Sequence, residues 1–406
     1  MKPASLATIL LAASVLPACI LDSNDDCDPG YHLETYSSWE GSPPSAPLLL
    51  SAGGERLLVW FANDGVHAAP VDADGTIGAD RVDSDGPRFA GVVVSAPDRH
   101  LVLRANQATQ RTDAILLAPD GTVRARRDGV LPGVSWTTGA WTGDGFVVSG
   151  QLQSGVTHGV IARLDADGGA VGDVVETGAG NEYRGVASVV ATGDVVWAVW
   201  GARVAPEDSA GNDLVGRRYT RALAPIDAEP QRLASQAAVA RLVPTADGAR
   251  ALMIGDGATY GDVVTIVLDA DGAGPVRGYD QLSYGGVVAA SADPAGGWDV
   301  AFGATDVPVT FPRYGESSAR VFRVRDDGAV DVVPGAEIRG SDALLVEEGQ
   351  VIAAGRTDTS TGTVGQAQLD LRVYRLDGAP QLHQIAATAT LELVETTSCA
   401  RDEFQD

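Results

Sequence analysis

A pattern of three apolar segments separated by turns returns seven times between residues 45 and 390. Each unit has an apolar run, a tight turn of Gly, Asp or Pro, a second apolar run, a polar loop, a third apolar run and another turn. The units repeat every 44 to 54 residues, because their first turns begin at residues 51, 95, 141, 191, 245, 294 and 347. A period of this length over nearly the whole chain indicates one repeat architecture.

The apolar runs have the composition of strands. Runs such as RLLVWF and VVWAVW are short, rich in Val, Leu and aromatic residues, and bounded by turn residues, which indicates strands and not helices. In most units the third run ends at Asp-Gly, the strongest short signal for a hairpin; these turns are DADG at 72, 165 and 269, PDG at 119, DDG at 326 and LDG at 376. The fourth unit has ALAP near residue 222. We therefore expect its last hairpin to turn differently.

A unit of about 50 residues with three or four antiparallel strands is typical of a β-propeller blade. In three units a glycine that follows an aromatic residue by two positions opens the first run, at Gly91, Gly185 and Gly286. We predict an all-β fold, a β-propeller of seven blades of about 50 residues, in a single domain over residues 31–399. The alternative is an elongated or split all-β assembly such as two sandwiches, but the regular spacing disfavours it.

Two strand-like runs, at residues 31–38 and 388–396, are left over after the seven units are counted. A ring of blades needs its ends fastened, because unpaired strand edges are a liability. We expect the two runs to meet in one blade and close the propeller. Cys27 and Cys399 lie next to them, so we predict a disulfide bond that locks the closure. Two unpaired thiols or a metal pair are the alternatives.

The first eighteen residues indicate export. Lys2 precedes an apolar stretch from Leu6 to Val15, which is too short to span a bilayer and fits a signal peptide over residues 1–18. The sequence Leu16-Pro17-Ala18-Cys19 resembles the lipobox of bacterial lipoproteins. This resemblance implies lipidation of Cys19, including palmitate, and membrane attachment through that anchor. A secretory signal that is cleaved elsewhere is the alternative.

The segments that flank the domain are polar. Residues 19–30 have the composition of a flexible tether, and residues 400–406 form a C-terminal tail. The lipobox implies a place in the cell envelope, outside the cytoplasm. Ile20, and not an aspartate, follows the cysteine, which by the sorting pattern of enteric bacteria points to the outer membrane of a Gram-negative bacterium. Because this pattern is not general, the choice between inner and outer membrane stays open.

Charge excludes several functions. The chain has 54 acidic and 29 basic residues, a formal net charge of -25, and Lys2 as its only lysine. Without that lysine the mature chain has no Schiff-base lysine, phosphate-loop lysine or Lys general base. An acidic surface also repels the nucleic-acid backbone, so we expect no nucleic-acid partner.

We expect no catalytic residue, metal site or cofactor on local sequence grounds. Each DADG run supplies two carboxylates and then resumes a strand, which a hairpin turn explains better than a calcium loop. The five histidines have no zinc spacing, and no Gly-x-Ser-x-Gly motif is present. His67 and His158 fit solvated strand-edge positions. A carboxylate pair assembled in space stays open, and four tryptophans fit the core: Trp60, Trp197, Trp200 and Trp298.

A binding surface is expected on one face of the propeller. The loops between second and third strands share that face with the connections between blades, and they are long after residues 201, 303 and 355. Variable loops on a rigid scaffold commonly carry binding sites. The candidate contact residues are Glu207, Asp208, Asn212, Asp213, Arg313, Tyr314, Glu316, Arg356 and Asp358. The alternative is that these loops are tolerated insertions.

The combination of repeat and N-terminal signal resembles bacterial β-propeller lipoproteins. The resemblance implies a lipid-anchored, non-enzymatic binding or scaffold module of the cell envelope, with a protein or glycan as its ligand. The alternative is an envelope hydrolase or lyase with a carboxylate-based site at the mouth of the propeller channel.

Overall fold

The fold is known from a computed structural model of the chain. The structure describes residues 31–40, 47–62, 65–73, 75–83, 91–106, 109–154, 156–177, 188–202, 213–235, 237–245, 248–255, 263–279, 288–292, 298–303, 318–325, 329–339, 341–347, 350–361, 364–375 and 381–401. In these ranges the regular structure is entirely β. None of the described residues forms a helix long and apolar enough to cross a membrane.

The described strands form seven antiparallel sheets, numbered here as blades 1 to 7. Blade 1 contains β2 (Leu48–Ala52), β3 (Glu55–Ala62), β4 (Gly65–Val71) and β5 (Arg81–Asp83). Blade 2 contains β6 (Val92–Ala96), β7 (Arg99–Asn106), β8 (Arg111–Leu117) and β9 (Val123–Pro132). Blade 3 contains β10 (Ser135–Trp141), β11 (Gly145–Ser154), β12 (Val156–Asp165) and β13 (Ala170–Glu176).

The later blades repeat this order. Blade 4 contains β14 (Ser188–Thr192), β15 (Val195–Ala202), β16 (Asp213–Thr220) and β17 (Gln231–Ala234). Blade 5 contains β18 (Ala237–Thr245), β19 (Gly248–Gly255), β20 (Val263–Leu268) and β21 (Arg277–Tyr279). Blade 6 contains β22 (Val288–Ala292), β23 (Trp298–Gly303), β24 (Ser318–Val324) and β25 (Val330–Arg339). Blade 7 contains β26 (Ser341–Glu347), β27 (Gln350–Thr361), β28 (Val364–Arg375) and β29 (Gln381–Arg401), and β1 (Tyr31–Glu40) pairs with β29.

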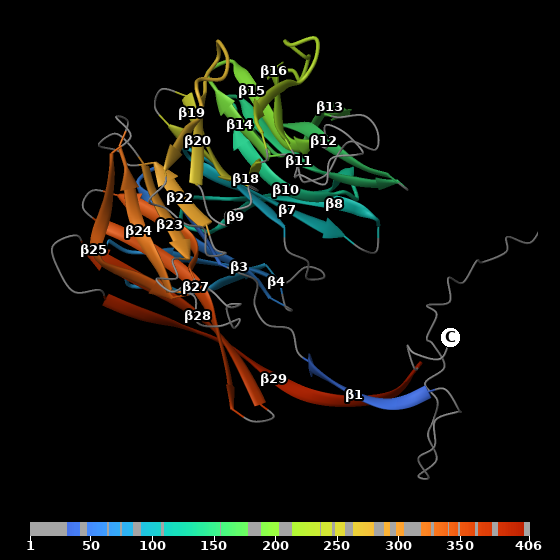
Figure 1. The fold of residues 1–406 in the computed structure, drawn as a ribbon, viewed down its shortest axis with the longest axis vertical. Helices are drawn as coiled ribbons and strands as arrows, with labels where there is room; N and C mark the ends of the chain where they lie inside the picture. The colour runs from blue at the N-terminus through green and yellow to red at the C-terminus, as the bar shows by residue number, and fades with distance from the viewer. Residues whose placement is uncertain are drawn as a thin grey trace, which may run out of the picture.

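The blades form a closed ring. The first strand of each blade contacts the first strand of the next, from β2 through β6, β10, β14, β18 and β22 to β26, and β26 contacts β2. Figure 1 shows the sheets in this succession around the body of the molecule. The predicted β-propeller fold is confirmed.

Apolar side chains fill the spaces between neighbouring blades. Leu57 and Phe61 of blade 1 pack with Val102 and Ile115 of blade 2, and equivalent clusters lie between the following blades. Alternate residues of each strand face opposite blades, because side chains alternate along a strand. The expectation that tryptophans belong to the core is confirmed for Trp60, Trp197 and Trp200, whereas the side chain of Trp298 lies outside the described residues.

The turn between third and fourth strands has the same geometry in blades 3 and 4. In blade 3 the amide of Gly168 donates to the carbonyl of Asp165 at 3.0 Å, and in blade 4 the amide of Leu223 donates to Thr220 at 2.9 Å. Both central residues have a left-handed backbone, with φ of 78° at Gly168 and 62° at Leu223. The prediction of a different turn in the fourth unit is therefore wrong. Burial of the Leu223 side chain offsets the strain of a non-glycine residue at this position.

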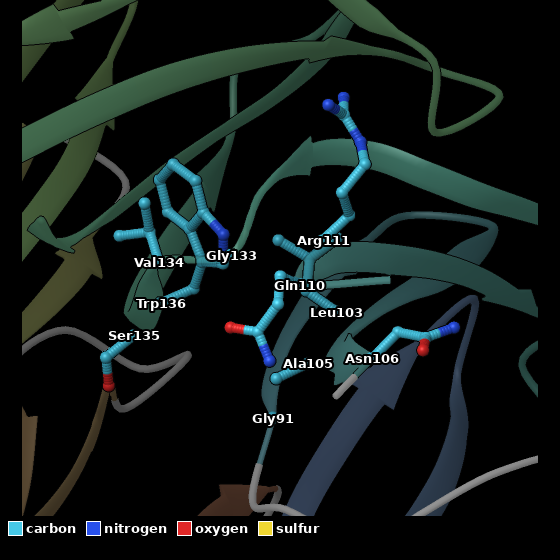
Figure 2. A pocket seen from close by; sticks show the side chains of 10 residues that line it. All are labelled: Gly91, Leu103, Ala105, Asn106, Gln110, Arg111, Gly133, Val134, Ser135 and Trp136. Carbon is cyan, nitrogen blue, oxygen red and sulfur yellow. The ribbon is translucent and has the colours of Figure 1, made fainter. Parts of the chain in front are cut away.

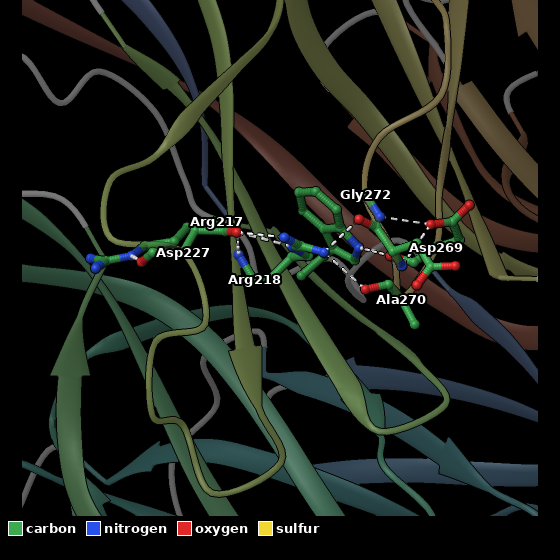
Figure 3. A network of polar contacts seen from close by, with 8 residues as sticks. Arg217, Arg218, Asp227, Asp269, Ala270 and Gly272 are labelled. Carbon is green, nitrogen blue, oxygen red and sulfur yellow. Dashed lines mark hydrogen bonds and ion pairs between the residues drawn. The ribbon is translucent and has the colours of Figure 1, made fainter.

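These turns also connect neighbouring blades. Nη1 of Arg218 in blade 4 donates to the carbonyl oxygens of Ala270 and Asp271 in the turn of blade 5, at 2.9 and 2.7 Å (Figure 3). Nη1 of Arg99 in blade 2 donates in the same way to Ala166 in the turn of blade 3, at 3.0 Å. In these two pairs of blades, an arginine of one blade therefore bonds the backbone of the turn in the next blade.

The terminal runs pair with each other, as predicted, in register from Tyr31 opposite Arg401 to Glu40 opposite Glu392. The place of the pairing differs from the prediction. The ladder between β28 and β29 extends only to Glu392, so β1 pairs with the part of β29 beyond it. Figure 1 shows this two-stranded ribbon extending away from the blades. The ring itself is closed by contacts between β2 and β26, and not by β1.

Candidate functional site

A pocket of about 360 Å³ lies between blades 2 and 3. It is located where β7 ends, β8 begins and the chain enters β10, which is the face that carries the loops between second and third strands and the connections between blades. The pocket lies on the same face as the loops that were predicted to bind a ligand, but none of the nine predicted contact residues lines it. Its lining is shown in Figure 2: Gly91, Leu103, Ala105, Asn106, Gln110, Arg111, Gly133, Val134, Ser135 and Trp136.

The backbone of Gln110 shapes one wall. Gln110 has a left-handed backbone with φ of 54°, which is unfavourable for a residue with a side chain. Its carbonyl oxygen lies directly against Gly133 in the connection to β10, where a Cβ atom would collide with it. Because glycine has no Cβ, Gly133 allows Gln110 to approach the connection that enters blade 3 this closely.

Trp136 forms the opposite wall and is held in place by hydrogen bonds. Its indole Nε1 donates to Oγ1 of Thr112 at 3.0 Å, and that hydroxyl donates to the carbonyl of Pro132 at 3.0 Å. The ring is buried and packs in the core between blades 2 and 3. The pocket thus has a rigid apolar side, to which Leu103, Ala105 and Val134 also contribute.

The polar side chains Gln110 and Arg111 extend in opposite directions at the pocket. Figure 2 shows the carboxamide of Gln110 extending toward the part of the pocket that Gly91 and Ser135 line, whereas the guanidinium of Arg111 extends in the opposite direction. Nε of Arg111 donates to the carbonyl of Gly129 at 2.7 Å, which fixes this orientation.

A buried carboxylate supports the rim of the pocket from behind. Asp113 accepts hydrogen bonds from Nδ2 of Asn106 at 2.9 Å and from the amide of Gly129 at 2.7 Å. Nη2 of Arg104 lies 3.8 Å from the same carboxylate and balances its charge. Oδ1 of Asn106 in turn accepts from the amide of Thr109 at 3.2 Å. This network joins Asn106, at the end of β7, and Thr109 to Asp113 of β8.

The lining residues include no carboxylate, histidine or cysteine. Such groups supply the general acids, general bases and most nucleophiles of hydrolytic catalysis. The polar lining consists of the amides of Asn106 and Gln110, the hydroxyl of Ser135 and the guanidinium of Arg111. Within the described ranges, no three His, Cys, Asp or Glu side chains are arranged to hold a metal ion.

The Asp-Gly turns use their carboxylates internally. Oδ1 of Asp269 accepts hydrogen bonds from the amides of Asp271 and Gly272, at 2.9 and 2.7 Å (Figure 3). Oδ1 of Asp165 accepts from its own turn in the same way. The first aspartate of each of these two turns therefore stabilises the hairpin, as the hairpin interpretation requires.

Two buried histidines have structural partners. His67 stacks on Trp60 with ring centroids 5.1 Å apart, and its Nδ1 lies 2.8 Å from Oδ2 of Asp80. The expectation of a solvated position is wrong for His67, because the space beside Trp60 between blades 1 and 7 encloses it. The side chain of His158 lies outside the described residues. His100 is fully buried beside Ser95 at 3.0 Å, and burial lowers its pKa from 6.5 to about 4.

Three of the predicted contact residues belong to strands. Asp213 begins β16, is only 6% exposed and pairs with Nε of Arg232 at 2.6 Å. Arg356 and Asp358 lie within β27, opposite Leu369 and Ala367 of β28. The segment after residue 355, which the sequence suggested as a loop, is thus mostly a strand ladder.

The structure does not describe the other six predicted contact residues. Glu207, Asp208, Asn212, Arg313, Tyr314 and Glu316 lie outside the described residues, as do Cys19 and Cys27. Cys399 lies in β29, opposite Leu33. Sequence reasoning did not select Gln110, Ser135 or Trp136; a polar residue beside a short loop carries no local signal of a pocket, because two blades are needed to form one.

No protein-family model matches the chain, and no curated protein matches its sequence. Among solved structures, the β-propeller domain of the Trilobed protease from Pyrococcus furiosus has a TM-score of 0.51 at 11% identity, covering 84% of this chain and 98% of that chain. The acylaminoacyl peptidase of Pyrococcus horikoshii has a TM-score of 0.50 at 14% identity, covering 85% of this chain and 52% of that chain. The periplasmic gluconolactonase of Pseudomonas aeruginosa has a TM-score of 0.49 at 16% identity, covering 86% of this chain and 99% of that chain. At these identities the likeness concerns the fold alone.

Proposed function

We propose that this protein is a lipid-anchored β-propeller of the bacterial cell envelope that binds a protein or glycan without catalysing a reaction. The observation that carries the proposal is the pocket between blades 2 and 3, whose lining has polar and aromatic groups but no carboxylate, histidine or thiol. A cavity with an apolar wall and a few fixed polar groups is the usual form of a small-ligand site.

The proposed anchor precedes the terminal ribbon and not the blades that form the pocket. The tether of residues 19–30 ends at Tyr31, which pairs with Arg401 at the far end of the ribbon (Figure 1). A chain of twelve residues spans at most about 40 Å. Lipid on Cys19 would therefore attach the membrane to the ribbon, while the pocket of blades 2 and 3 lies on the body of the propeller.

The lipid anchor has a direct test. Metabolic labelling with a radioactive fatty acid should label the natural protein and leave Cys19→Ser unlabelled. Equal labelling of both forms would contradict the proposed anchor. The measurement is independent of any ligand.

The binding face is tested by photocrosslinking in the cells that make the protein. A photoreactive amino acid at Ser135, which is exposed at the pocket, should give a discrete adduct. The same group at Asp194 is the matched control, because its side chain is 90% exposed on the opposite face of the propeller. Adducts of equal yield at both positions would contradict a binding face. Release of products from an envelope glycan by the purified protein would instead support the hydrolase alternative.

A further inference from the structure

We infer that the terminal ribbon is a dimerisation arm, in which β1 of one copy of the chain pairs antiparallel with β1 of a second copy. The observation that carries the inference is the unbroken ladder of ten residue pairs between β1 and β29, whose outer strand β1 is the edge of blade 7. The inference goes beyond the proposed binding function and is independent of the pocket.

The edge that β1 presents differs from the edges of the other blades. A free strand edge is a template for pairing, and proteins protect such edges with short strands, bulges, proline or lysine. In the described residues, the outer strands of the other six blades follow this rule. Three of them have only three or four residues (β5, β17 and β21), and three join their neighbour with a register shift (β9, β13 and β25).

β1 has none of these protective features. It has ten residues in continuous register with β29. Neither Tyr31–Glu40 nor the paired segment, residues 392–401, contains proline, glycine or lysine. A long and regular edge of this kind favours pairing with a further strand.

The ribbon also lacks a third strand. The ladder between β28 and β29 extends to Glu392, and beyond it β29 pairs with β1 alone among the described strands. Figure 1 shows this part of the chain extending away from the blades. A two-stranded ribbon is at best marginally stable in water, whereas three or more strands with an apolar face form a stable sheet. Two ribbons that pair through β1 form a sheet of four strands.

The sequence of β1 matches an antiparallel copy of itself. A twofold axis at Tyr36 places residues 32–40 of the two copies opposite each other. Leu33 of one copy is then opposite Trp39 of the other, and His32 is opposite Glu40. Each of these matches occurs twice, and apolar and polar cross-strand pairs of this kind stabilise a sheet.

Other registers fit less well. An axis at Glu34 places this residue opposite its own copy, and an axis at Ser37 places Glu34 opposite Glu40, so both oppose like charges. An axis at Thr35 avoids such pairs but leaves Glu40 without His32 as its partner. The register centred on Tyr36 is therefore the one that we assign.

The charge of the chain favours a contact on an arm. The formal net charge is -25, so the blades of two copies repel each other in direct contact. Because the pairing is antiparallel, the two sets of blades lie at opposite ends of a sheet about 30 Å long. This separation exceeds the Debye length of about 8 Å at physiological ionic strength.

The test begins with the mass of the full-length protein in detergent, measured by sedimentation equilibrium. We expect a monomer–dimer equilibrium with a dissociation constant on the order of micromolar, because nine paired residues form a small interface. A monomer at every concentration up to about 100 μM would overturn the inference and leave the edge to a strand of another protein. Assemblies larger than a dimer would also overturn it, because a head-to-tail contact forms open chains.

Two matched variants separate the edge from the rest of the ribbon. Tyr36→Lys places two lysines opposite each other at the axis and should raise the dissociation constant at least about tenfold. Thr396→Lys is the control, because Thr396 lies opposite Tyr36 on β29 and is one strand away from the edge. Both variants should keep the melting temperature of the natural protein. Both also keep Cys19, so dimers of equal affinity in the two variants would indicate association through lipid and overturn the inference.

Disulfide trapping tests the register and does not depend on a destabilising change. Directly opposite residues of an antiparallel pair have Cα atoms about 4.5–5.5 Å apart, which a disulfide can join. Tyr36→Cys should therefore give an oxidised dimer that peptide mapping shows to be joined at position 36. Ser38→Cys is the control, because its two copies are offset by four residues, about 13 Å along the strands. Equal trapping at both positions, or none at position 36, would overturn the inference.

Discussion

The indole Nε1 of Trp197 in blade 4 donates a hydrogen bond of 2.7 Å to the carbonyl oxygen of Asp269 in blade 5. The donor belongs to a fully buried ring, and the acceptor begins a tight turn that Arg218 also bonds at its next two carbonyls. The guanidinium of Arg218 lies over the Trp197 ring, 5.9 Å from its centroid. One aromatic ring and one cation therefore connect two blades through backbone groups.

Replacing Arg218 by methionine should loosen this connection. Arg218 donates to Asp227 at 2.7 Å and holds the pKa of that carboxyl below its ordinary value, in addition to its bonds to the next blade. We expect Arg218→Met to lower the free energy of unfolding in urea by about 1–3 kcal/mol, because partly buried partners of a charged donor lose their bonds. Arg221→Met is the control, because Arg221 pairs with a largely exposed Asp194 and should change stability by less than about 0.5 kcal/mol. Equal losses of unfolding free energy in both variants would contradict a stabilising contribution from the contact between blades 4 and 5.

Substitutions at Leu223 should reverse the usual order of alanine and glycine. Both variants lose a buried side chain and should be less stable than the natural protein by about 2–5 kcal/mol. Because φ is 62° at this residue, the glycine variant should be more stable than the alanine variant by about 1 kcal/mol. Thermal and urea unfolding of the three forms measure the difference. An alanine variant at least as stable as the glycine variant would contradict the left-handed turn.

The free energy of unfolding should decrease at acid pH because His100 is buried in its neutral form. Burial lowers the pKa of this side chain from 6.5 to about 4, so the unfolded chain takes up a proton at a higher pH than the folded protein does. The stability that is present above pH 6.5 is therefore lost as the pH falls toward 4, by up to about 3 kcal/mol. His100→Gln keeps a polar partner for Ser95 and cannot take up the proton. The free energy of unfolding in urea should therefore fall less between pH 7 and pH 4.5 in this variant than in the natural protein. Identical declines would contradict the prediction.

The Cys27–Cys399 disulfide remains a prediction of the cysteine positions. In the chain-entropy model a bond that closes so long a loop contributes at most roughly 5 to 6 kcal/mol. Non-reducing peptide mapping should recover the two cysteine peptides joined, and Cys399→Ser should lower the melting temperature without changing fatty-acid labelling. Recovery of both peptides with alkylated thiols would contradict it.

Local sequence was sufficient for the strands and for most of the turns. The Asp-Gly pairs at residues 120 and 167 mark hairpins because a left-handed residue and a short carboxylate act within a few positions of each other. The same logic was misleading at Leu223, where a buried side chain supports the conformation that glycine usually takes. It was also misleading for the segment around Arg356. Its polar composition indicated a loop, but these residues pair in the ladder between β27 and β28.

Repeat period and turn chemistry are properties of neighbouring residues, so the sequence by itself determined the all-β propeller. The N-terminal signal is also a local property, and export remains a prediction from it. The pocket depends on contacts between residues from different blades: the carbonyl of Gln110 against Gly133, and Trp136 bonded to Thr112. Only the tertiary structure decided these contacts and the position of the terminal ribbon, because the packing angle of two blades and the register of distant strands set them, and neither is encoded in a local pattern.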